Sequence, residues 1–156
     1  MKSVQAVLAN PTTHASAVLV GAKAVLIRGP SGAGKSMLAW DLIEAGARGG
    51  LPFARLVADD RAYLEPHGGR LLVRSAQELA GLIEIRGLGI RRLPYEPVAA
   101  VGLVVDLAAA DAGRMPSREA RMAEIAGIRL PRIPVAPGAA ALPLLLGALK
   151  TLPTGD

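Results

Sequence analysis

A phosphate loop is the sequence feature that most restricts how this chain can fold. Its residues match the pattern G-x-x-x-x-G-K-[ST] and are Gly29, Pro30, Ser31, Gly32, Ala33, Gly34, Lys35 and Ser36. The apolar run 24–27 before the loop predicts a buried strand. Leu38, Leu42 and Ala45 follow it with the spacing of one helix face. Strand, loop and helix in this order predict an α/β nucleotide-binding domain.

The chemistry of a phosphate loop explains this composition. Glycines let the backbone wrap closely around an anion, and the helix N-terminus aims N–H groups at phosphate oxygens. Lys35 adds a positive charge that reaches the outer phosphates, and the Ser36 hydroxyl can bind Mg²⁺. The alternative is a glycine-rich turn that only links strand to helix, which needs no Lys-Ser ending. The loop predicts binding of a nucleotide or polyphosphate without identifying the phosphate acceptor.

Composition narrows the class of protein. The chain has 156 residues, of which 51% are hydrophobic, so we expect one compact domain over residues 1–156 rather than disorder. It has no cysteine, which excludes disulfides and thiolate metal sites and fits the cytoplasm. The net charge is +5, but aromatic residues make up only 3%, so stacking platforms for single-stranded nucleic acid are not expected. Phosphate binding accounts for the basic balance more simply.

Neither end of the chain predicts a membrane segment. Residues 1–10 carry no convincing secretory signal. Residues 133–149 are uncharged, but three prolines interrupt this run and it is short for a membrane span. We expect a strand at 133–135 followed by a short buried helix with Leu142, Leu145, Leu146 and Leu149 on one face.

A pair of acidic residues follows the next predicted strand after the phosphate loop. The run 55–58 is strand-like and ends in Asp59-Asp60. Carboxylates at this place suit a Walker-B acid, one orienting Mg²⁺ and the other accepting a proton from an attacking hydroxyl. A plain polar turn is the alternative, because aspartate favours turns.

The remaining chain predicts a sheet-rich fold with no linker. The runs 18–20 and 24–27 predict one hairpin, and 62–64 and 70–73 predict a second, turned at residues 67–69. Further strands are expected at 82–86, with Glu84 and Arg86 on a polar face, and at 101–105 in the centre of the sheet. A short helix is expected within 75–79, and a longer one from Arg118 to Ala126, ended by Gly127.

Taken together, these motifs resemble the catalytic domain of HPr kinase/phosphorylase, a bacterial enzyme of the sugar phosphotransferase system. The matching features are His14 ahead of the phosphate loop, the loop itself, the Asp59-Asp60 pair and the string from Glu84 to Ile90. That string, Glu-Ile-Arg-Gly-Leu-Gly-Ile, is the most specific of them. The resemblance extends from about residue 14 to about residue 138.

The resemblance implies a fold and a reaction. The fold would be a phosphate-loop domain like the core of phosphoenolpyruvate carboxykinase, with a mixed sheet and flanking helices. The reaction would transfer phosphate from ATP, with Mg²⁺, to a serine of HPr in the cytoplasm. In the reverse direction, inorganic phosphate would remove that group and give pyrophosphate. The family's assembly makes a homo-oligomer an expectation, with no nucleic acid and no membrane among the partners.

The resemblance also assigns roles to residues. His14 is similar to the active-site histidine, Lys35 to the catalytic lysine of the loop, and Ser36 and Glu84 to the two Mg²⁺ ligands. The Asp59-Asp60 pair is similar to the catalytic acidic pair, and which of the two is the base stays open. Arg114, within Gly-Arg-Met-Pro, resembles a later catalytic arginine.

Three departures from the family pattern bear on these expectations. Longer members have a further N-terminal domain, whereas this chain starts almost at the catalytic domain and resembles the short form of some proteobacteria. The segment 49–55 lengthens the link before the acidic strand. Ala136 and Ala139 stand where many members have basic residues, in a region that the family ties to the phosphorylase direction. Whether that direction is retained therefore stays open.

Two other functions remain open from the residues alone. A small-molecule kinase could phosphorylate a metabolite hydroxyl with the same loop and acid. A non-catalytic ATP-binding regulator would need the loop but not the acidic pair.

Overall fold

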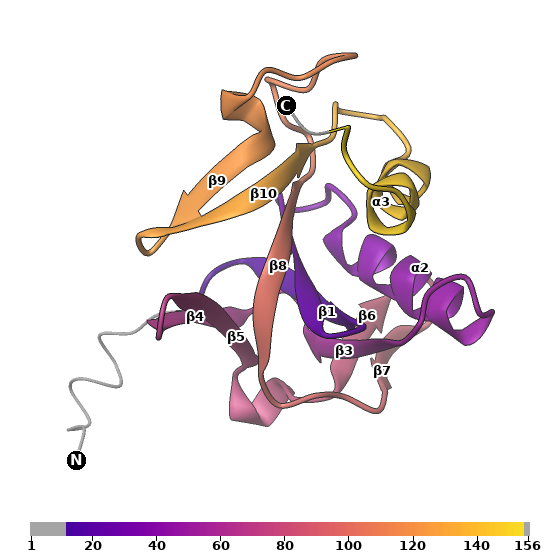
Figure 1. Cartoon of the computed structure of the whole chain (residues 1–156). Helices are drawn as coiled ribbons and strands as arrows, with labels where there is room; N and C mark the ends of the chain where they lie inside the picture. The colour runs from indigo at the N-terminus through magenta and orange to yellow at the C-terminus, as the bar shows by residue number, and fades with distance from the viewer. Residues whose placement is uncertain (1–11, 155–156) are drawn as a thin grey trace.

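The computed structural model describes residues 12–154, which form one large sheet, one small sheet and two helices (Figure 1). The large sheet runs in the order β3-β1-β2-β8-β10-β9, and the β4–β5 hairpin joins it through β5 and β8, while β6 and β7 pair separately. The strands are β1 (Ala15–Val20), β2 (Lys23–Arg28), β3 (Ala54–Ala58), β4 (Ala62–His67), β5 (Arg70–Ser75), β6 (Leu82–Ile85), β7 (Gly89–Arg92), β8 (Ala99–Asp106), β9 (Met122–Ile125) and β10 (Ile128–Pro134). The helices are α2 (Lys35–Ala47) and α3 (Ala141–Lys150), with short 3₁₀ turns η1 (Gln77–Leu79) and η2 (Glu119–Arg121).

Strand direction decides which residues meet. β1 is antiparallel to both β2 and β3, whereas β8 is parallel to β2 and to β10. The four strands β2, β3, β8 and β10 therefore point the same way, and their carboxyl ends lie along one edge of the sheet. The start of β1 lies at that same edge. In open α/β sheets this edge is where ligands bind.

Alternating residues build a core on each face of the sheet. On β1 and β2, Val18, Val25 and Ile27 face the helices, where they pack with Leu38 and Leu42 of α2. Figure 1 shows α2 and α3 on this same side of the sheet. As predicted, Leu145 of α3 is fully buried there, with three further α3 leucines packed against the cluster: Leu142, Leu146 and Leu149.

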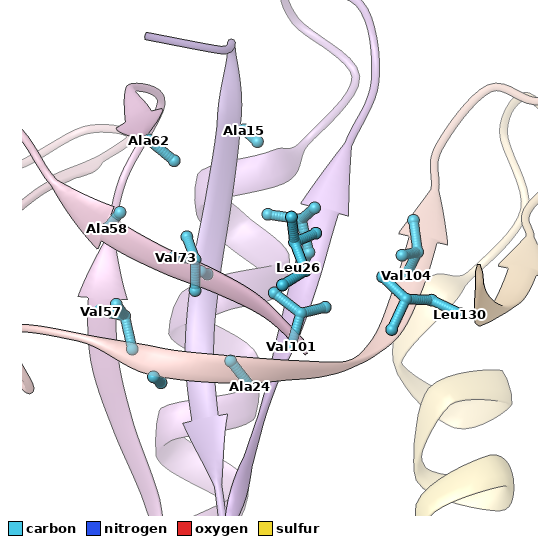
Figure 2. Close-up of a cluster of buried hydrophobic side chains, with 13 residues drawn as sticks. Ala15, Ala24, Leu26, Val57, Ala58, Ala62, Val73, Val101, Val104 and Leu130 are labelled. Atoms are coloured by element: carbon cyan, nitrogen blue, oxygen red, sulfur yellow. The ribbon is translucent and has the colours of Figure 1, made fainter. Parts of the chain in front are cut away.

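The opposite face is covered by the two outer hairpins rather than by helices. Leu26 of β2 and Val101 and Val104 of β8 pack there with Val73 of β5 and Leu130 of β10. Figure 2 shows these side chains gathered between the strands. Because side chains alternate along a strand, one apolar run on β2 supplies both cores.

Most of the predicted elements are present. The hairpins β1–β2 and β4–β5, the strand β3 before the acidic pair and the central strand β8 are confirmed. The fold class is confirmed as well: α/β, with a mixed sheet flanked by helices. The strand β6 ends one residue earlier than predicted, at Ile85, because the chain turns through Gly87 and pairs back as β7.

The predicted helix from Arg118 to Ala126 is wrong. The chain makes only the single turn η2 there and continues as β9, which pairs antiparallel with β10. Ala126 and Gly127 form the two-residue connection, and both have positive φ, at 52° and 79°. This is the backbone of a type I′ hairpin turn. Pairing with β10 outweighs the helix propensity of this alanine- and glutamate-rich segment.

No helix within residues 12–154 is long and apolar enough to cross a membrane. The uncharged run 133–149 is instead divided between the end of β10 and helix α3.

Candidate active site at the carboxyl edge of the sheet

The phosphate loop connects the carboxyl end of β2 to the first turn of α2. Gly34 caps the helix with a left-handed φ of 99°, and Gly32 has a φ of 81°, so both positions favour glycine for conformational reasons. The side chain of Lys35 is buried, and its Nζ donates to the carbonyls of Gly29 (2.9 Å) and Pro30 (3.2 Å). The lysine thus holds the loop in a curve, with the free amides of the helix N-terminus beside it.

The start of the loop rests on β8. The N–H of Leu107 donates to the carbonyl of Arg28 at 2.8 Å. A Cβ added to Gly29 would lie 3.0 Å from the Cβ of Leu107. A side chain at this glycine would therefore push against the residue that follows β8, and the contact with β8 helps to fix where the loop begins.

Asp59 is a hub that joins three elements. Its Oδ1 accepts the hydroxyl of Ser36 on α2 at 2.6 Å and the hydroxyl of Ser16 on β1 at 2.8 Å. Its Oδ2 accepts the backbone N–H of Glu84 on β6 at 3.1 Å. This is the position of a Walker-B acid relative to the serine of the loop. Because both oxygens already accept hydrogen bonds, Asp59 is engaged as an acceptor.

Asp60 has a different environment from its neighbour. It has a φ of 64°, and the N–H of Arg61 donates to the carbonyl of Asp59 at 2.8 Å, which makes a γ-turn centred on Asp60. Such a turn with positive φ is rare and strained, and strain of this kind clusters at functional sites. The Asp60 side chain is 58% exposed, and its Oδ1 lies 3.8 Å from Nδ1 of His14.

A bulge in β3 precedes the acidic pair. The pairing with β1 passes from Ala17↔Ala58 to Val18↔Leu56, so Val57 has no partner of its own. A bulge of this kind bends the strand and re-aims the residues after it. It therefore helps to turn Asp59 toward α2 and Asp60 toward His14.

One cavity of about 400 Å³ brings part of the predicted site together. Loop residues 31–36 and Met37 line one side, and Asp60, Glu84 and Arg86 line the other. Arg86 was not predicted as a site residue. Its alternation with Glu84 was the signal that could have identified it, because residues two apart on a strand share a face.

The oxygen donors suit Mg²⁺, which usually keeps several waters and takes one or two protein ligands. Ser36 and Glu84 both line the cavity, and the Ser36 proton is directed to Asp59, which leaves the hydroxyl oxygen able to bind a cation. Within residues 12–154 no cluster of three or more histidine, aspartate or glutamate side chains forms a metal site by itself. The residues therefore fit a cation shared with a bound polyphosphate.

Four predicted site residues lie outside the lining but contact residues within it: Gly29, Pro30, His14 and Asp59. Arg114 does not line this cavity either. It is exposed in the connection between β8 and η2. Its catalytic role stays a prediction. Ala136 and Ala139 lie in the turn after β10, where the Ala139 N–H donates to the Ala136 carbonyl.

A second carboxylate at this edge is neutralised by arginines. Asp106, at the end of β8, accepts two hydrogen bonds of 2.7 Å from Arg28 and one from Nε of Arg132. Arg132 also donates to Asp111 and to the carbonyl of Ala120. Burial raises the pKa of Asp106, but the hydrogen bonds and charges of the two arginines outweigh burial and hold that pKa below its ordinary value.

Comparisons with known proteins agree with this geometry. The model of the HPr Serine kinase C-terminal domain matches residues 6–148. HPr kinase/phosphorylase of Geobacillus thermodenitrificans is 38% identical over 143 residues, which are 82% of this chain and 44% of that protein. HPr kinase/phosphorylase of Chloroherpeton thalassium is 35% identical over 140 residues, which are 80% of this chain and 38% of that protein.

A solved structure supports the fold as well. The HPr(Ser) kinase/phosphatase of Coxiella burnetii superposes with a TM-score of 0.69 at 29% identity, covering 89% of this chain and 93% of that chain. The chain spans less than half the length of the two relatives above. The candidate site lies within residues 6–148, which the family model matches. The family match, the sequence identity and the superposition together show that this chain belongs to the HPr serine kinase C-terminal domain family.

Proposed function

We propose that this protein is an ATP-dependent kinase that phosphorylates a serine of the phosphocarrier protein HPr in the phosphotransferase system. The observation that carries the proposal is that Asp60 and the phosphate loop line the same cavity. A binding module needs the loop alone, whereas transfer to a hydroxyl needs a carboxylate opposite it. The names of the relatives supply HPr as the acceptor.

The loop and Lys35 would bind and orient the polyphosphate of ATP. Phosphoryl transfer depends mainly on positioning and on neutralising charge, and loop amides, a helix N-terminus and an ammonium group do both. Lys35 is already directed into the loop through the carbonyls of Gly29 and Pro30. A bound phosphate would compete for those Nζ protons.

We assign Asp60, rather than Asp59, as the base. Asp59 is occupied by two hydroxyls and one N–H, whereas the Asp60 carboxylate is exposed to the cavity. The serine Oγ of HPr forms the new bond to the γ-phosphorus, and the bond from that phosphorus to the bridging oxygen of ADP breaks. The serine proton passes to Asp60. In the reverse direction the protonated Asp60 returns it to the serine.

Mg²⁺, when bound, would neutralise the phosphate oxygens beside Ser36 and Glu84. His14 lies beside Asp60 and would orient that carboxylate or contact the transferred phosphoryl group. Arg86 would add positive charge on the other side of the cavity. Arg114 would contribute only if its loop closes over the bound substrate.

The phosphorylase direction is part of the proposal. It would use the same residues, with inorganic phosphate as the acceptor and pyrophosphate as the product. We place the reaction in the cytoplasm, since the chain has no cysteine and ATP is its substrate. A homo-oligomer remains the expectation for its assembly.

The test is transfer of labelled γ-phosphate from Mg-ATP to purified HPr of the same organism. Lys35→Ala is the inactive control, and Lys23→Ala, a lysine on β2 outside the cavity lining, is its matched control. We expect labelling of one HPr serine that depends on Lys35 and not on Lys23. A second sample containing phospho-HPr and inorganic phosphate should release pyrophosphate if Ala136 and Ala139 do not abolish the reverse reaction.

Other outcomes would assign the protein differently. ATP binding without labelling of HPr, together with labelling of a metabolite, would favour a small-molecule kinase. ATP binding with no transfer to any hydroxyl would favour a regulatory module. Equal transfer by wild type and Lys35→Ala would contradict the assigned site.

A further inference from the structure

Ser16 is a buried hydroxyl beneath the acidic pair. In residues 12–154 the buried polar side chains are two, Ser16 at 0% exposure and Lys35 at 7%. Burying a hydroxyl without partners is costly, so such groups persist where they make hydrogen bonds. Lys35 belongs to the phosphate loop, which makes Ser16 the one buried polar residue of the described chain that the proposed chemistry does not use.

Both hydrogen-bonding functions of Ser16 are directed to the acidic pair. Its Oγ donates to Oδ1 of Asp59 at 2.8 Å and accepts the backbone N–H of Asp60 at 3.2 Å. The first bond fixes the Asp59 carboxylate, whose same oxygen accepts the hydroxyl of Ser36 at 2.6 Å. Ser16 is therefore linked to the serine that ends the phosphate loop through one shared oxygen of Asp59.

The second bond supports the strained turn. Asp60 has a φ of 64°, which costs free energy for a residue other than glycine and persists only when the surroundings enforce it. Ser16 accepts from the N–H of Asp60, and the N–H of Ala15 donates to the Asp60 carbonyl at 3.2 Å. Two adjacent residues of β1 thus hold both sides of the Asp60 backbone.

We propose that Ser16 is a positioning residue for phosphoryl transfer: it sets the Asp59 carboxylate for the loop serine and holds the turn that presents Asp60 to the acceptor hydroxyl. Ser16 does not contact the cavity itself, since it is fully buried and absent from the lining. The proposal rests on the function proposed above, because Asp60 must be the base for its position to matter in catalysis.

The first test measures how firmly the backbone at Asp60 is held, and it needs no substrate. In Ser16→Ala the Asp60 N–H loses its acceptor, so its amide hydrogen exchange, measured by NMR, should become at least about tenfold faster. Amides in the middle of β2 serve as the internal reference for global stability. Ser75→Ala is the matched control, because the Ser75 hydroxyl donates only to the carbonyl of Ala76. It should leave Asp60 exchange unchanged.

The second test measures kcat and KM for phosphoryl transfer. Ser16→Ala should lower kcat about tenfold and leave the KM for ATP nearly unchanged, because the loop amides and Lys35 remain in place. Ser16→Cys keeps a side chain of similar size with a weaker donor and acceptor, and should lie between wild type and Ser16→Ala. It also keeps the test usable if Ser16→Ala does not fold.

The outcomes separate the two proposals. Unchanged Asp60 exchange in both variants would overturn the positioning role, whatever the activity. Faster exchange with kcat intact would overturn its catalytic part. If wild type transfers no phosphate at all, the proposed function fails, and the exchange experiment still decides whether Ser16 holds the turn. Parallel changes in kcat and in exchange would support the inference.

Discussion

Two aspartates end two parallel strands of one sheet, and they are held in opposite ways. Asp59 follows β3 and accepts hydrogen bonds only from neutral groups, two hydroxyls and an amide. Asp106 ends β8 and is paired with the guanidinium groups of Arg28 and Arg132. The charge of Asp106 is neutralised within the protein, whereas the charge of Asp59 is not. The end of β8 is therefore a structural ion-pair site. Under the proposed function, the end of β3 keeps its negative charge for a cation that accompanies the phosphates.

The largest effect should come from Asp60→Asn. Asparagine tolerates positive φ, so the variant keeps the turn and removes only the proton acceptor. We expect kcat for phosphoryl transfer to fall by about 10³-fold, within the usual range for loss of a general base. Rapid-quench measurement of labelled HPr checks this. Glu124→Gln on β9 is the matched control. Full activity of Asp60→Asn would contradict the assignment of Asp60 and would mean that another group is the base.

Asp59→Asn should have the next largest effect and should act on both nucleotide binding and rate. All three partners of Asp59 are donors, so an amide NH₂ must face at least one of them. We expect the affinity for Mg-ATP to fall by about tenfold and the rate by about 10²-fold. Titration with a fluorescent nucleotide separates the two. A rate loss with unchanged Mg²⁺ dependence would contradict the role assigned to Asp59 beside Ser36.

Asp106→Asn should act on stability rather than chemistry. It leaves Arg28 and Arg132 without their shared carboxylate, and breaking such a pair is destabilising. We expect a loss of about 2 kcal/mol in the free energy of unfolding, less than for a fully buried pair because Arg28 is partly exposed. Urea denaturation measures it. A folded Asp106→Asn protein should retain the KM for ATP of wild type.

The stability that Asp106 contributes should depend on pH in a definite direction. The pKa of Asp106 is lower in the folded protein than its ordinary value of 3.8. Its contribution is therefore complete above pH 3.8 and is lost as the pH falls below 3.8 through the folded pKa. The difference in unfolding free energy between wild type and Asp106→Asn should be constant at neutral pH and shrink in that acidic range. A constant difference down to pH 2 would show that the arginines do not stabilise the ionised form.

The smallest effect is expected at Ala126, which like Asp60 is a residue other than glycine with positive φ. Its φ of 52° enforces a turn for which asparagine followed by glycine is preferred. Ala126→Asn should raise the free energy of unfolding by about 0.5 kcal/mol and leave phosphate transfer unchanged. Asp60→Gly would also relieve backbone strain, but it should abolish transfer because it removes the proposed base. Thermal unfolding and the transfer assay together check the contrast, and lower stability of Ala126→Asn would contradict the turn type.

Much of the fold was accessible from sequence because local patterns and long-range pairing agree there. The run before the phosphate loop is apolar and follows a short turn, so β1 and β2 were predictable, as was the acidic pair after β3. The segment 118–126 failed because its local preference is helical, whereas its structure is set by β10, which lies later in the chain.

The candidate site was predictable where its residues belong to a known sequence motif. The loop and the two acids lie at one edge of the sheet as expected. Ser16 gave no signal, because a single serine in an apolar strand is ordinary until its partners are known. Which aspartate is engaged with the loop serine also depends on the bulge at Val57, and a bulge has no sequence signature here.

The contact between the phosphate loop and β8 has a consequence for how the protein is made. Every residue proposed here to line the cavity lies before position 87, yet the strand that supports the loop spans Ala99–Asp106. During synthesis, which proceeds from the N-terminus, the residues that line the cavity leave the ribosome before their support exists. Pairing of β2 with β8 joins segments that are far apart in the chain, with Ala24 opposite Val101 and Arg28 opposite Asp106, and therefore forms late. A nascent chain would therefore gain the ability to bind ATP in one step, when β8 pairs with β2.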